Sequence, residues 1–222
     1  MSADVLVVIA KAPVAGRSKT RLCPPCTPEQ AAALAQAALQ DTFAAVLATP
    51  ARRRVLVLEG ERGTWLPEGF EVIAQRGAGL DERLAAAFED VGEAAFLVGM
   101  DTPQLTEAHL ASGLEALGTA TSVFAPADDG GYWGIGLRTP DARVFRGVAM
   151  SADDTGARQR ERLIELGLTV EDLPGLLDVD TIADARAVAR LAPHTRFARE
   201  LAAMELAVVS VGDQPHVGSH RS

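Results

Sequence analysis

The chain has 222 residues, of which 48% are hydrophobic, so it can bury the core of one domain with room for a small additional lobe. Its formal net charge of -9 argues against binding to nucleic acids and to anionic membranes, because negatively charged surfaces repel one another. No apolar run approaches the ~18 residues of a membrane span, and residues 1–4 lack the basic segment of a secretory signal. A cytoplasmic protein is therefore expected.

Short apolar runs alternate along the chain with longer amphipathic stretches, a pattern typical of an α/β fold. Strands are predicted over residues 5–10, 54–58, 70–74, 95–99, 122–125 and 132–137. Helices are predicted over residues 28–47, 81–91, 107–117, 154–166, 182–191 and 194–206. The strands 5–10 and 95–99 are nearly continuous hydrophobic runs, which places them at the centre of a mostly parallel sheet flanked by helices. We expect one domain over residues 1–206 and a flexible tail over residues 207–222.

The loop after the first predicted strand is strongly basic. Lys11, Arg17, Lys19 and Arg21 fall within eleven residues, and no acidic residue lies between positions 5 and 28. In an acidic chain this local reversal of sign predicts a site for a dense anion, such as a diphosphate, at the carboxyl edge of the sheet. Gly16 permits a sharp turn, the arginines offer bidentate contacts, and the lysines act as point charges. A solvated basic loop that pairs with surface carboxylates is the alternative.

Carboxylates follow in two later segments that the topology can bring to the same edge. Asp101 stands at the end of the predicted strand 95–99, where an unpaired buried charge would be costly and a hard cation such as magnesium would suit it. Asp178 and Asp180 project from the same side of an extended segment, and they repel each other unless a cation relieves them. Joined to Asp101, they would bind one or two divalent ions. The alternatives are that Asp101 caps a turn and that Asp180 caps the helix 182–191.

The segment 125–137 combines acids, glycines and aromatic residues. Its glycines would allow close approach of a ligand, and an aromatic face can stack on a sugar or a base. Asp128 or Asp129 could orient or deprotonate an acceptor hydroxyl. The alternative is a tight hairpin whose aromatic residues, Tyr132 and Trp133, pack into the core. The sequence contains neither a Walker A motif nor a G-x-G-x-x-G motif, which argues against the corresponding nucleotide-binding folds.

Five ordered blocks of the sequence resemble a single group of proteins. They read AKAPVAGRSKTRL (10–22), QRGAGLDERLAAAF (75–88), VGMDTPQLT (98–106), APADDGGYWGIGL (125–137) and LDVDT (177–181). This pattern is similar to the GT-A-like transferases of undefined substrate, often described as radical-SAM/selenodomain-associated transferases, which are related to the 2-phospholactate guanylyltransferases. The resemblance spans roughly residues 5–188. It implies a Rossmann-like GT-A fold, that of nucleotide-diphospho-sugar transferases, and a nucleotide-linked donor.

The resemblance also implies roles for particular residues. The aspartate that matches Asp101 binds metal in the family, and those that match Asp178 and Asp180 join it in the guanylyltransferase relatives. The expected contacts to the nucleotide and its phosphates are Lys11, Gly16, Arg17, Lys19, Arg21, Gln75 and Arg83. One departure is Gln104, which stands where the family usually carries an acid.

The sequence therefore predicts a magnesium- or manganese-dependent transferase that uses a nucleotide-diphosphate sugar and a small-molecule acceptor. Asp101, Asp178 and Asp180 would hold the metal, Lys19 would stabilise the leaving phosphate, and Asp129 would handle the acceptor. A nucleotidyltransferase that expels pyrophosphate from a nucleoside triphosphate, with a small phosphorylated acceptor, would use the same residues. A non-catalytic nucleotide-binding module is the third alternative.

Overall fold

The computed structural model describes residues 4–150 and 152–212. Within these residues seven strands form one sheet in the order β3-β2-β1-β4-β6-β5-β7. The strands are β1 (Val5–Lys11), β2 (Arg53–Glu59), β3 (Glu71–Ala74), β4 (Ala95–Val98), β5 (Ser122–Pro126), β6 (Tyr132–Leu137) and β7 (Val170–Asp172). Only β6 runs antiparallel to its neighbours, so the prediction of a mostly parallel sheet is confirmed. The short edge strand β7 was not predicted.

The six predicted helices are all present. They are α1 (Pro28–Ala48), α2 (Leu80–Val91), α3 (Glu107–Thr119), α4 (Thr155–Glu165), α5 (Ile182–Leu191) and α6 (Arg196–Gly212), and two short 3-10 turns, η1 (Thr20–Leu22) and η2 (Ala142–Val144), lie between them. Helix α6 continues beyond residue 206, so residues 207–212 of the predicted tail are helical, and residues 213–222 lie outside the described part of the chain. Residues 207–211 contain no glycine or proline, so no helix-breaking residue stands before Gly212.

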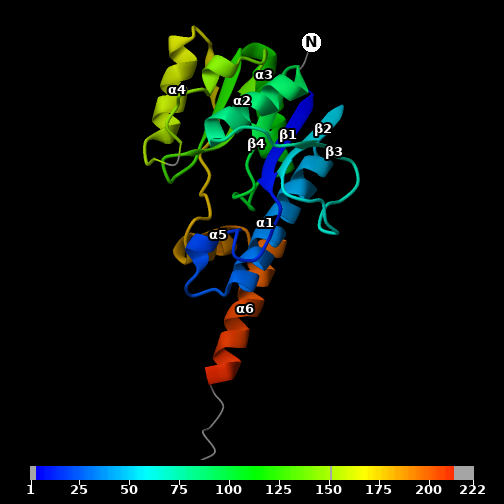
Figure 1. The fold of residues 1–222 in the computed structure, drawn as a ribbon, viewed down its shortest axis with the longest axis vertical. Coiled ribbons are helices and arrows are strands. Elements are labelled where there is room, and N and C mark those ends of the chain that lie inside the picture. The colour runs from blue at the N-terminus through cyan, green and yellow to red at the C-terminus, as the bar shows by residue number, and fades with distance from the viewer. Residues whose placement is uncertain (1–3, 151, 213–222) are drawn as a thin grey trace, which may run out of the picture.

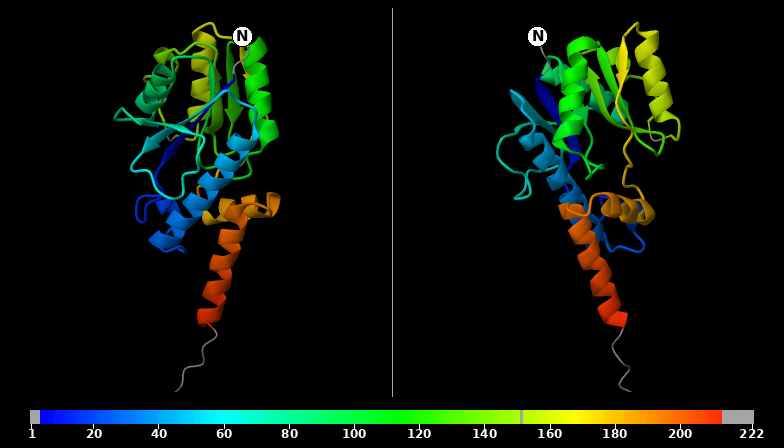
Figure 2. Two further views of the ribbon diagram at one scale, coloured as in Figure 1. Left: turned by 90° about the vertical axis from the view of Figure 1, so that its right-hand side faces the viewer. Right: turned by 180° about the vertical axis from the view of Figure 1, so that it is seen from behind.

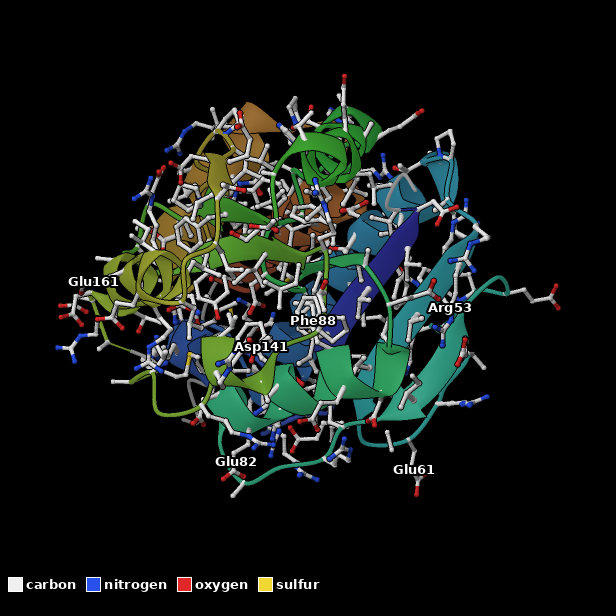
Figure 3. All side chains as sticks on the ribbon, turned by 90° about the horizontal axis from the view of Figure 1, so that it is seen from above. Arg53, Glu61, Glu82, Phe88, Asp141 and Glu161 are labelled. Atoms are coloured by element: carbon white, nitrogen blue, oxygen red, sulfur yellow. The ribbon has the colours of Figure 1, made fainter. Side chains whose placement is uncertain are left out.

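The helices cover both faces of the sheet, as Figures 1 and 2 show. Alternation along β1 sends Leu6 and Val8 into one core, with α1 and α3, and Val5 and Val7 into the other, with α2, η2 and α4. In the view from above, Phe88 of α2 points into this second core while acidic side chains such as Glu161 point outward (Figure 3). The result is a three-layer α/β arrangement.

A third apolar cluster lies beyond the sheet, where the first half of α1 meets α5 and α6. It buries Leu22 and Val179 completely, together with Leu34 of α1 and Phe197 of α6. Helix α1 is long and apolar enough to cross a membrane by length and composition. Its burial against the sheet on one stretch and in this third cluster on another accounts for that composition without a membrane.

Asp41 joins α1 to the start of α6. Its carboxylate is 9% exposed and accepts hydrogen bonds from the backbone N–H groups of Arg196 at 2.9 Å and Phe197 at 2.8 Å. These N–H groups belong to the first turn of a helix and have no partner within it.

We predict that Asp41→Ala lowers the free energy of unfolding by about 1–2 kcal/mol, because the amino-terminal N–H groups of α6 lose their acceptor. Urea denaturation followed by circular dichroism measures this change. Asp41→Asn retains one acceptor oxygen and should lose less. Equal stability of the alanine variant and the wild type would contradict this account of how α6 is attached.

Candidate active site

A cavity of about 740 Å³ opens at the carboxyl ends of β1 and β4. Its walls come from the end of β1, the loop 99–102 after β4, residues 127–134 in the turn before β6 and at the start of β6, residues 150 and 152–155, and the acidic segment 178–180. Chain connections leave β1 and β4 in opposite directions along the sheet, which makes this the point where open α/β sheets bind their ligands.

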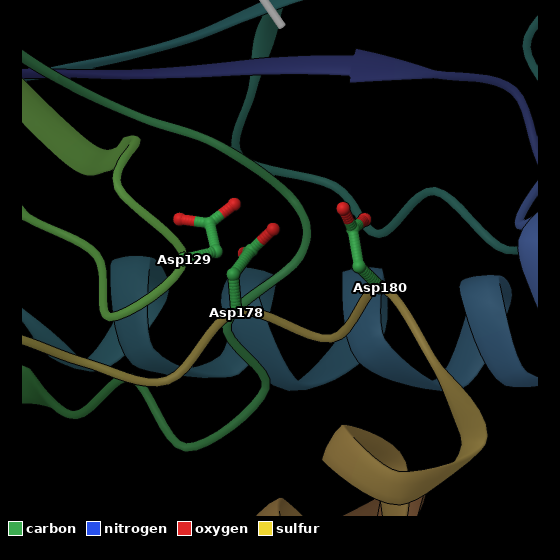
Figure 4. Close-up of side chains that lie close together, drawn as sticks. All are labelled: Asp129, Asp178 and Asp180. Atoms are coloured by element: carbon green, nitrogen blue, oxygen red, sulfur yellow. The ribbon is translucent and has the colours of Figure 1, made fainter. Parts of the chain in front are cut away.

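Three carboxylates gather in this cavity. Asp129 comes from the turn between β5 and β6, and Asp178 and Asp180 come from the extended segment before α5 (Figure 4). One oxygen of each lies within 4.8 Å of the others. Val179 between them is fully buried in the third cluster, so both aspartates are turned to the cavity side. An all-oxygen set of this kind suits Mg²⁺ or Mn²⁺.

Asp101 is engaged differently from the other predicted ligands. Its Oδ1 atom lies 2.7 Å from the Lys19 ammonium, which also donates a hydrogen bond to the Val179 carbonyl oxygen. The Lys19 side chain is only 9% exposed. Burial alone would lower the pKa of Lys19, but the charges of Asp101, Asp178 and Asp180 outweigh it and raise that pKa. The ammonium group that was expected to meet phosphate is therefore the buried counter-ion of the acidic residues.

The acids remain crowded in spite of Lys19. Burial, followed by the charge of Asp101, raises the pKa of Asp178 to about 8, with smaller contributions from Asp129 and Asp180. Burial and the neighbouring carboxylates each disfavour a further negative charge in the cavity. A divalent cation would relieve the same repulsion, so the arrangement favours cation binding.

The remaining residues of the basic loop differ in how close they lie to the cavity. Arg21 lines it and pairs with Asp180, with 2.5 Å between Nη1 and Oδ2, while 69% of its side chain is exposed. Lys11 lines it as well, and its ammonium lies 3.5 Å from Glu59. Gly16 and Arg17 are exposed on the outer part of the loop and do not line this cavity. Gly16 has a φ of 75°, which agrees with the predicted sharp turn.

The predicted nucleotide contacts Gln75 and Arg83 both line the cavity beside the end of β1. Gln75 donates hydrogen bonds to the carbonyl oxygens of Ala10 at 2.8 Å and Val57 at 3.1 Å, and Arg83 forms an ion pair with Glu59. Burial would raise the pKa of Glu59, but the hydrogen bond from Arg83 and the charge of Lys11 lower it. Sequence analysis missed Glu59, although an acid at the end of a predicted strand was a signal.

Tyr132 and Trp133 both pack against the core and also line the cavity, Trp133 as a buried residue and Tyr132 as a partly buried one. Trp133 is 2% exposed, packs edge-on against Phe96 and donates from its indole nitrogen to the Pro174 carbonyl oxygen at 3.1 Å. Burial raises the pKa of Tyr132, so its phenol stays protonated. Gly130 has a φ of 88°, and a side chain there would collide with the backbone of residue 153, so this glycine serves chain packing rather than ligand approach.

Asp153 is a second residue that sequence analysis missed. It lines the cavity from the segment that packs against the Gly130 turn, and it is exposed. It directly precedes the predicted helix 154–166, and the contact with the Gly130 turn brings it to the site.

Known proteins share this architecture. The profile of the family DUF2064, uncharacterized proteins conserved in bacteria, matches residues 31–152. A crystal structure of a candidate nucleotide-diphospho-sugar transferase from Desulfovibrio desulfuricans G20 is 26% identical, with a TM-score of 0.80, over 93% of this chain and 96% of that one. The chain therefore has the predicted fold of nucleotide-diphospho-sugar transferases.

More distant structures share the fold alone. A nucleotidyl transferase from Methanothermobacter thermautotrophicus is 15% identical, with a TM-score of 0.56, over 88% of this chain and 98% of that one. The manganese complex of Rv0371C from Mycobacterium tuberculosis H37Rv is 23% identical, with a TM-score of 0.50, over 86% of this chain and 100% of that one. None of the curated proteins matches.

We predict that Lys19→Met destabilises the metal-free protein by about 2 kcal/mol, because it leaves the acidic residues without their buried counter-ion. Thermal and urea unfolding of the chelator-treated protein measure the loss. Arg17→Met is the matched control, since it removes a cation from the same loop that is exposed and does not line the cavity. If the two variants were equally stable, Lys19 would not act as the counter-ion.

Proposed function

The chain belongs to the DUF2064 family, and from this premise we propose that it is a metal-dependent transferase that uses a nucleotide-diphosphate-sugar donor. The observation that carries the proposal is the cluster of Asp129, Asp178 and Asp180 in a cavity at the switch point of a nucleotide-diphospho-sugar transferase fold. The donor set, the raised pKa of Asp178 and the confinement of the acids all support a divalent cation there.

The proposed ligands are Asp129, Asp178 and Asp180, with Mg²⁺ or Mn²⁺ as the ion. Asp101, whose charge already acts on Asp178, is proposed as a further ligand from the loop after β4. When bound, the ion would supply Lewis-acid stabilisation of charge on the donor diphosphate. Lys19 would hold the acids in place and contribute positive charge beneath them.

The cations at the rim complete the donor side. Lys11 and Arg21 have side chains that are 60% and 69% exposed, so they can turn toward a bound diphosphate at little cost. Arg17 and Gly16, on the same loop, are proposed to approach the outer phosphate. Gln75 and Arg83 lie beside the end of β1, where we place the nucleoside.

The acceptor side of the cavity differs in charge from the donor side. Among the described residues, the lining contributed by residues 127–134 and by residues 150 and 152–155 includes Asp129 and Asp153 but no cation. A phosphorylated acceptor would be repelled there, so we infer an uncharged or cationic small molecule that offers a hydroxyl or amine. Asp129 borders both the acids and this side, and we propose that it also orients the acceptor. This charge pattern favours sugar transfer over nucleotidyl transfer to a phosphorylated acceptor.

The proposed setting follows from composition. A protein of net charge -9 with such a cavity would act on free small molecules, and we propose the cytoplasm as its location. Neither nucleic acid nor a membrane is proposed as a partner.

The test is product identity. The protein is incubated with a panel of nucleotide sugars and nucleoside triphosphates, with Mg²⁺ or Mn²⁺ and small polyol and amine acceptors, and the released group is identified. Released nucleoside diphosphate supports sugar transfer. Released pyrophosphate would instead identify a nucleotidyltransferase.

We predict that Asp178→Asn lowers turnover of any active donor by about 10²-fold or more, because it removes charge from the centre of the acidic cluster. The matched control is Asp172→Asn. Asp172 lies on β7, forms an ion pair with Arg160 of α4 and does not line the cavity. Wild-type turnover in the Asp178 variant would contradict the proposed mechanism.

A further inference from the structure

The peptide group that precedes Asp178 is held by a side chain from a distant loop. The carbonyl oxygen of Leu177 accepts a hydrogen bond from Nε2 of Gln104 at 2.6 Å. Because a peptide group is planar, fixing this oxygen also fixes the N–H of Asp178 and the direction in which its Cα leaves the plane. The hydrogen bond from Gln104 therefore holds the peptide plane from which Asp178 enters the cavity.

A second hydrogen bond of this kind holds the peptide group two residues later, before Asp180. The carbonyl oxygen of Val179 accepts a hydrogen bond from Lys19, and this fixes the peptide plane that precedes Asp180. The backbone N–H of Val179 in turn donates to the carbonyl oxygen of Asp101 at 3.0 Å. Each aspartate of the D-x-D segment thus follows a peptide plane that another segment of the chain holds.

The Gln104 amide makes one hydrogen bond and, within the described part of the chain, leaves one buried atom without a partner. Its Oε1 atom is buried and has no hydrogen-bond partner among the described residues. An unsatisfied buried acceptor costs about 1–3 kcal/mol. A methionine, which has similar length and no amide, would remove that cost together with the bond to Leu177. What the amide provides in return is the hydrogen bond that holds the peptide group before Asp178.

The chemistry of the amide suits that role. An ionised acid at position 104 could not donate to the Leu177 carbonyl oxygen, and it would bring another negative charge toward Asp178 and Asp101. The neutral amide donates the hydrogen bond and adds no charge. Gln104 is therefore matched to a loop that must be held firmly next to a crowded acidic cluster.

We propose that Gln104 is a positioning residue that orients Asp178 toward the divalent cation. This inference rests on the proposed metal site, and it concerns a residue that does not itself touch the ion. Partners of this kind behind a metal ligand change metal affinity by about 10- to 100-fold when they are removed.

The experiment measures Mn²⁺ binding and stability separately. MnCl₂ is titrated calorimetrically into chelator-treated full-length wild type and Gln104→Met, and the melting temperature of each metal-free protein is recorded. We expect Gln104→Met to bind Mn²⁺ at least about 10-fold more weakly. Its metal-free melting temperature should stay close to that of the wild type, because the change removes the unsatisfied Oε1 atom but also leaves the Leu177 carbonyl oxygen without its donor.

The matched control is Gln159→Met, on α4. Gln159 is fully buried and donates to the Val144 carbonyl oxygen at 2.8 Å, away from the acidic segment. Its replacement should lower the melting temperature and leave Mn²⁺ affinity unchanged, which is the opposite pattern.

Three outcomes would overturn the proposal, and they are distinguishable. Wild-type Mn²⁺ affinity in Gln104→Met would reject the positioning role while the metal site stands. A Gln104→Met protein that melts well below the wild type would reveal a merely structural contact. Absence of Mn²⁺ binding by the wild type itself would reject the metal site and, with it, the inference.

Discussion

Repulsion among the carboxylates at the end of the sheet is the constraint on which the rest of the site depends. Asp101, Asp129, Asp178 and Asp180 reach one cavity from three segments of the chain, and Lys19 is the buried cation that faces them. Its contact with Asp101 and with the Val179 carbonyl links the first loop to the last acidic segment. One side chain therefore ties together two parts of the chain that are 160 positions apart in sequence.

Local patterns were sufficient to predict most of the fold. The hydrophobic runs of β1 and β4 and the long apolar stretch of α1 need only neighbouring residues to be recognised. The short strand β7 escaped prediction because its residues Val170–Asp172 are mostly exposed and polar, and only pairing with β5 makes them a strand. The end of α6 was predicted too early. The small and polar residues near the end of the chain suggested a tail, whereas the helix continues past residue 206 to Gly212.

The sequence predicted which residues lie at the site better than it predicted which of them contact one another. Sequence spacing placed Asp178 and Asp180 on one side of an extended segment, and the burial of Val179 between them agrees. It could not show that Lys19 would be buried against Asp101, since side-chain reach across 82 positions depends on how two loops pack. For the same reason Asp129 was assigned to the acceptor, and its proximity to the acidic pair became visible only in three dimensions.

The third apolar cluster has a consequence for how the molecule can be shortened. Leu22, which follows the basic loop, and Val179, which separates the two acids, are both buried against the first half of α1, α5 and the start of α6. Helix α6 projects from the body of the protein in Figure 1, which makes it an obvious segment to delete when the chain is shortened. A truncation that ends before Arg196 would remove side chains that pack against both Leu22 and Val179. The basic loop and the acidic segment would then both lose support. The protruding helix thus supports the loops that carry the proposed site, although none of its described side chains lines the cavity.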